Sequence, residues 1–85
     1  MSEEKSQVEM ARDIISQLKE MKHYAQTNVE KLAEFWLQAS EEIKIEGMAD
    51  KIEVLLNNSN SFNENLDSTI SDVELECNRI DNEAE

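Results

Sequence analysis

Cysteine and histidine, which often serve as nucleophiles, general bases and zinc ligands, each occur once in this sequence, as Cys77 and His23. A thiol nucleophile needs a base within hydrogen-bonding reach, and these two residues stand far apart along the chain. A structural zinc site needs four such ligands. We therefore interpret His23 as a surface residue and Cys77 as a small buried hydrophobe, which is how an unreactive cysteine behaves.

Carboxylates are the other side chains that could do chemistry, because the chain has 20 acidic residues against 8 basic ones. Paired carboxylates can act as acid and base or bind calcium, but no calcium-loop spacing occurs. Asp72, Glu74 and Glu76 lie in a helical row without a glycine turn. Glycine-rich phosphate loops and Cys-x-x-Cys pairs do not occur either. The sequence therefore predicts a protein that is not an enzyme and that takes no cofactor, metal ion or small molecule.

The acidic residues are unevenly distributed, and the net charge is −12. From Ile52 to the last residue there are nine acids, and Arg79 is the only base. Such a surface repels nucleic acids and anionic membranes and attracts basic protein patches. We expect no direct nucleic-acid partner and no membrane partner. We expect Asp67, Glu74 and Asp81 to form an acidic face toward a basic partner.

The N-terminal residues lack the basic and then apolar pattern of a signal peptide, and no apolar run exceeds three residues. A lone cysteine is typical of a reducing compartment. These features favour a cytoplasmic or nuclear protein.

Helix-breaking residues are almost absent, since there is no proline and Gly47 is the only glycine. The spacing of the apolar residues supports an all-α fold, because a row from Val8 to Ile43 recurs at alternating steps of three and four. That is the heptad pattern of a helix whose seam faces another helix. The row contains Val8, Ala11, Ile15, Leu18, Lys22, Ala25, Val29, Leu32, Trp36, Ala39 and Ile43. Ile14, Met21 and Phe35 widen this stripe, which favours a bundle of three or four helices over a two-stranded seam.

The pattern predicts one helical domain over residues 1–85, with a long helix over about 4–57, a turn at 57–61 and a shorter helix over 62–82. The turn is placed at the cluster of turn-forming residues Asn57-Asn58-Ser59-Asn60-Ser61. Thr27 with Glu30 resembles a capping box, but the heptad phase passes through it unchanged. Near Gly47 the phase slips, which indicates a change of supercoil, a bend or a close approach of a partner.

Because the first expected helix is about twice as long as the second, the stripe from Val8 to about Val29 has no partner within the chain. We therefore expect a coiled coil or helical bundle that is completed by oligomerisation or by another protein. The residues expected at helix interfaces are Val8, Ile15, Leu18, Val29, Leu32, Phe35, Trp36, Ile43, Ile52, Leu55, Phe62, Leu66, Ile70, Val73 and Ile80.

These features favour a non-enzymatic coiled-coil interaction subunit of a larger intracellular assembly. Its partners would be protein helices, either copies of itself or a heterologous protein with basic patches. One alternative is an acidic inhibitor or nucleic-acid mimic that blocks a basic groove. Another is a small secreted helical-hairpin protein, since the chain resembles the type-VII-secreted class in length and acidity. The Trp-x-Gly turn of that class is missing here, because Trp36 is followed by Leu37 and Gln38.

Overall fold

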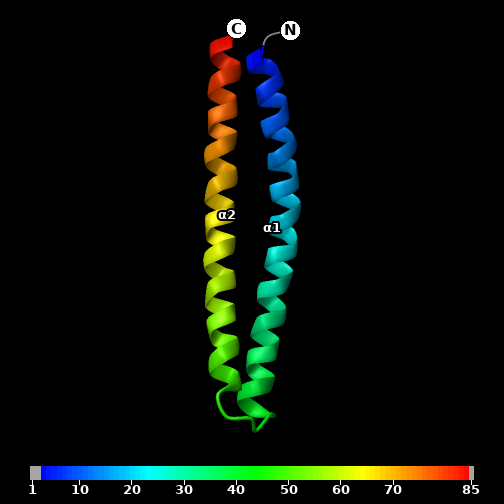
Figure 1. The fold of residues 1–85 in the computed structure, drawn as a ribbon, viewed down its shortest axis with the longest axis vertical. Helices are drawn as coiled ribbons and strands as arrows, with labels where there is room; N and C mark the ends of the chain where they lie inside the picture. The colour runs from blue at the N-terminus through cyan, green and yellow to red at the C-terminus, as the bar shows by residue number, and fades with distance from the viewer. Residues whose placement is uncertain (1–2, 85) are drawn as a thin grey trace.

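The computed structural model describes the backbone of residues 3–84, and it is a helical hairpin (Figure 1). Helix α1 spans Glu3–Glu41 and helix α2 spans Met48–Ala84. The two helices run antiparallel along nearly their whole length and form a rod of 63 × 15 × 14 Å, with the chain ends together at one end and the turn at the other. The expected all-α fold is confirmed, because the described residues contain these two packed helices and no strand.

Helix α1 runs without interruption through Thr27. The Thr27 hydroxyl donates a hydrogen bond to the carbonyl of His23 one turn earlier, at 3.3 Å, as a threonine inside a helix does. The Thr27 side chain is therefore not the cap of a new helix. The helix ends at Glu41, where the carbonyl of Gln38 accepts from the amides of both Glu42 and Ile43, at 2.8 and 3.0 Å.

The turn lies at residues 42–47 and depends on Gly47. The amide of Met48 donates to the carbonyl of Ile45 at 3.3 Å, which closes a tight turn. Gly47, the third residue of that turn, has a φ of 82°, in the left-handed region that glycine adopts without a steric penalty. Its carbonyl then accepts from Lys51 at 3.1 Å and starts α2. No atom lies within 4 Å of the space that a Cβ at Gly47 would occupy, so the glycine serves the backbone conformation and not a close contact.

The expected helix over 4–57, turn at 57–61 and helix over 62–82 were therefore wrong, because residues 57–61 lie inside α2. A heptad row runs through that region from Ala49 to Ile80 without a change of phase, but it includes the polar residues Ser59 and Asn63. Each asparagine or serine costs a helix only about 0.5 kcal/mol. Packing along a second helix of nearly equal length outweighs that cost.

The best-buried part of the seam between α1 and α2 lies in the half of the rod nearest the chain ends. Val8, Ile15 and Ala25 of α1 pack there with Leu66, Ile70 and Cys77 of α2 to form the core. Near the turn the seam is thinner, and its larger side chains are only half buried. The expectation that Val8–Val29 lacks an intramolecular partner was wrong, because α2 covers this stretch.

Candidate protein-interaction surface

Most of the expected interface residues lie in the seam between α1 and α2. Those that are buried or half buried there are Val8, Ile15, Leu18, Val29, Leu32, Trp36, Ile43, Ile52, Leu66, Ile70, Val73 and Ile80. Phe35, Leu55 and Phe62 are different, since they are 49%, 55% and 49% exposed. These three side chains therefore do not belong to the seam between α1 and α2. Leu55 and Phe62 each stand one position away from the heptad row that the structure uses, which contains Leu56 and Asn63.

One edge of the hairpin is lined by ion pairs between the two helices. Arg12 contacts Asp81 at 2.6 Å, Lys19 contacts Glu74 at 2.9 Å, and Lys22 pairs with Asp67. The same contact with Asp81 raises the pKa of Arg12. The three acids expected to face a basic partner thus already have basic partners on α1. That expectation is corrected, because each of these three acids is paired with a base from the other helix.

Polar residues continue this edge into the seam. Asn63, a half-buried residue of the α2 row, donates its amide Nδ2 to Oε1 of Gln26 at 2.8 Å. Its own oxygen Oδ1 is buried and has no hydrogen-bond partner. Lys22 extends from a seam position toward Asp67, so its charge lies at the edge of the seam and not inside it. A polar residue at a seam position favours one helix register over others at some cost in stability.

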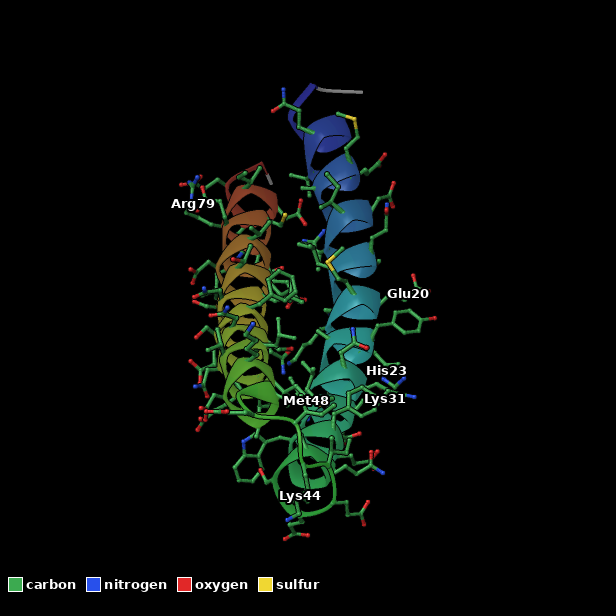
Figure 2. All side chains as sticks on the ribbon, turned by 60° about the horizontal axis from the view of Figure 1, so that its bottom comes forward. Glu20, His23, Lys31, Lys44, Met48 and Arg79 are labelled. Atoms are coloured by element: carbon green, nitrogen blue, oxygen red, sulfur yellow. The ribbon has the colours of Figure 1, made fainter. Side chains whose placement is uncertain are left out.

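The opposite side of α1 carries an exposed row that is mainly apolar, which we call the outer α1 stripe. Its members also recur at alternating steps of four and three, and all are exposed: Met10, Ile14, Gln17, Met21, Tyr24, Asn28, Lys31 and Phe35. The five apolar members are between 48% and 63% exposed. Lys31 is the only charged residue in the row, and Figure 2 shows it projecting outward on α1.

Two more exposed apolar side chains, Leu55 and Phe62 of α2, lie on the same edge of the hairpin as Phe35 of α1. Each of the three directly precedes a residue of its own helix's seam row. Together with the stripe they give a surface of seven large apolar side chains. Soluble monomers rarely expose a continuous apolar patch above a few hundred Å², and larger ones mark binding surfaces. Sequence reasoning placed Ile14, Met21 and Phe35 beside the seam but missed Met10 and Tyr24. Their spacing of three and four from these residues is the signal that could have identified them.

The remaining outward positions of α1 carry negative charge. Six acids and no lysine or arginine occupy two neighbouring outward rows of α1: Glu9, Asp13, Glu20, Glu30, Glu34 and Glu41. On α2, Arg79 lies between Glu76 and Glu83 and pairs with both. Its hydrogen bond holds the pKa of Glu76 below the ordinary value and raises the pKa of Arg79. The acids of α1 thus lie beside the outer α1 stripe rather than within it, and Glu76, Arg79 and Glu83 lie on the same edge of the hairpin near the chain ends.

The residues that could do chemistry are not brought together. Cys77 is buried in the seam with 3% exposure, whereas His23 is exposed and its ring lies edge to face with Tyr24, with 5.8 Å between ring centroids. Among the side chains that the structure describes, no group of three or more His, Cys, Asp or Glu residues is arranged to hold a metal ion. Within residues 3–84, neither helix has a stretch that is long and apolar enough to cross a bilayer.

Comparisons with protein-family models, with curated proteins and with solved structures gave no match to this chain. The geometry of the hairpin and its surfaces is therefore the basis for assigning a function.

Proposed function

We propose that this protein is a non-enzymatic interaction subunit that binds other protein helices through the outer α1 stripe, in a cytoplasmic or nuclear assembly. The observation that carries the proposal is the contrast between the two edges of the hairpin. One edge satisfies its charges with ion pairs between α1 and α2. The other leaves seven large apolar side chains about half exposed to water.

The spacing of the exposed apolar residues indicates the kind of ligand. Residues at alternating steps of three and four form a straight strip along a helix, and the complementary shape is another helix lying alongside it. A compact ligand would need an enclosed cavity instead. A helix laid along α1 from Met10 to Phe35 would contact every apolar member of the stripe.

The energetics of a two-helix rod also favour a partner. A domain of this size buries a modest share of its surface, and small folds commonly gain stability by association. Among the described residues, no large side chain is fully buried. Covering the stripe would contribute roughly 25 cal/mol for each Å² of apolar area that is removed from water.

Photo-cross-linking in cells that produce the protein tests this proposal, with a benzophenone amino acid placed at Tyr24 or at the neighbouring His23. Both residues are exposed, but only Tyr24 belongs to the stripe. We expect cross-links to a polypeptide, either another copy or a different protein, from position 24 and few from position 23. Equal cross-linking from both positions, or none from position 24, would contradict the proposal.

The six acids on the outward rows of α1 favour a second candidate function, an acidic inhibitor or nucleic-acid mimic that occupies a basic groove. The two functions differ in their response to salt. Binding through carboxylates weakens steeply as salt concentration rises, whereas binding through the apolar stripe changes little. Replacing Glu30 and Glu34 with glutamine would weaken a mimic and leave helix binding nearly unchanged.

A further inference from the structure

We infer that the outer α1 stripe binds the same stripe of a second copy, with the two α1 helices antiparallel about a two-fold axis. This inference rests on the proposed function and names the partner. A two-fold interface brings a surface against itself, so the surface must be complementary to its own reversed copy. The outer α1 stripe meets this requirement.

The order of residue types along the stripe is nearly the same in both directions. In an antiparallel pair centred between Met21 and Tyr24, each residue lies opposite a residue of the second copy, and the two residue numbers add up to 45. Met21 then lies opposite Tyr24, and Met10 lies opposite Phe35, so that apolar residues meet apolar residues at the centre and at both ends. The spacing makes these pairs equivalent to the layers of an antiparallel coiled coil.

The polar members of the stripe fit the same arrangement. Gln17 lies opposite Asn28, and two amide side chains can hydrogen-bond to each other. Lys31 lies opposite Ile14, which its aliphatic stem can cover while its charge extends to Asp13 of the second copy. Neither Lys31 nor Asp13 has an ion-pair partner among the described residues of its own chain.

The charge distribution allows two copies to approach although each carries a net charge of −12. The only charge within the stripe is the positive one of Lys31, and the acids of the neighbouring row, Asp13, Glu20 and Glu34, lie at the rim of the interface, where they stay in contact with water. At physiological salt the Debye length is about 8 Å, so charges on the distant faces are largely screened.

The apolar area available is close to that of a standard interface. Leu55 and Phe62 of α2 flank the five apolar residues of the stripe, and these seven side chains, each about half exposed, offer roughly 700 Å² if each fully exposed side chain presents about 200 Å². A standard stable interface buries about 800 Å² on each partner.

Sedimentation equilibrium of the full chain from 1 to 200 µM tests the inference, with Met21→Glu and Leu37→Glu as a matched pair. Both methionine and leucine are about half exposed, at 48% and 49%, but Leu37 lies off the stripe. We expect a dimer for the wild type and for Leu37→Glu. Met21→Glu should weaken dimerisation about 100-fold or more, because two carboxylates would meet near the axis. Circular dichroism should show the same helical content for all three proteins.

Cysteine cross-linking tests the antiparallel pairing separately, in a Cys77→Ala background that removes the native thiol. Met10→Cys mixed with Phe35→Cys should form a disulfide-linked dimer, and Met10→Cys alone should form little. A wild type that stays monomeric at 200 µM, or a Met10→Cys protein that links to itself as readily as to Phe35→Cys, would overturn the inference. If the protein is monomeric but position 24 still cross-links to another polypeptide in cells, the second copy is excluded while the proposed helix-binding function stands.

Discussion

Replacing Asn63 with leucine should make the hairpin more stable. Asn63 occupies a half-buried seam position, its Oδ1 has no hydrogen-bond partner, and its amide makes one hydrogen bond to Gln26. Removing a buried unsatisfied acceptor recovers about 1–3 kcal/mol, whereas losing the hydrogen bond costs about 0.5–1.5 kcal/mol. Half burial of a leucine side chain adds about 1 kcal/mol. We therefore expect the free energy of unfolding to rise by about 1–2 kcal/mol.

Urea unfolding followed by circular dichroism at one fixed protein concentration measures this change. Asn57→Leu is the matched control, because Asn57 lies on the same helix but is exposed, and surface changes usually stay within about 0.5 kcal/mol. In a thermal scan the seam variant should melt roughly 5–15 °C higher, at about 4–8 °C per kcal/mol for a domain of this size. If Asn57→Leu and Asn63→Leu had equal effects, or if Asn63→Leu were destabilising, Asn63 would not lie in the seam and the register described here would be refuted.

Three further predictions follow from the turn, the core and the acidic pairs. Gly47→Ala should lower the free energy of unfolding by about 1 kcal/mol in urea unfolding, because alanine is strained at a φ of 82° even though its Cβ would meet no other atom; no loss would show that the turn can form without a left-handed residue. Ile70→Ala should cost about 2–5 kcal/mol at a position that is 5% exposed, whereas Leu75→Ala at 67% exposure should cost under about 0.5 kcal/mol, and equal costs would place the core elsewhere. The pKa of Glu76 is lowered by Arg79, so the pair stabilises the fold above the ordinary glutamate pKa, and this contribution is lost as pH falls through the lowered value. Glu76→Gln should therefore flatten the pH dependence of the free energy of unfolding in that acidic window. An unchanged slope would show that the ion pair does not form in solution.

The all-helical fold and the α1 seam could be predicted from the sequence because they depend on local rules. Proline is absent, and the row from Val8 to Ile43 keeps a constant phase, so propensity and periodicity agree over α1. Ile15 and Leu18, for example, lie in the seam because their spacing of three and four residues from their apolar neighbours keeps them on one face of the helix.

The position of the turn could not be predicted by the same rules, because two local signals were in conflict. The cluster Asn57–Ser61 has the composition of a turn, whereas Gly47 is a single residue. Packing between the two helices decides the position of the turn, because a turn at Gly47 gives two helices of 39 and 37 residues that cover each other. A turn at 57–61 would leave half of the longer helix uncovered.

The ion-pair edge was also beyond local reasoning. Asp67, Glu74 and Asp81 have no base near them on their own helix face, and counting charges along the sequence therefore suggested an external partner. Arg12, Lys19 and Lys22 approach them only because α1 returns antiparallel at this register. The outer α1 stripe, by contrast, follows a heptad spacing of its own and can be read from the sequence once the seam is known.

Methyl NMR of the protein labelled at the methionine methyl groups tests most directly whether another helix covers the outer α1 stripe. Met10 and Met21 belong to the stripe, and Met48, which begins α2 at the turn, lies outside it and serves as an internal control. Between 5 µM and 1 mM, we predict that the Met10 and Met21 methyl resonances shift or broaden together while the Met48 resonance stays constant. Met10 and Met21 resonances that remained unchanged over this range, or that moved no more than the Met48 resonance, would contradict the assignment of this stripe as the surface through which the protein associates.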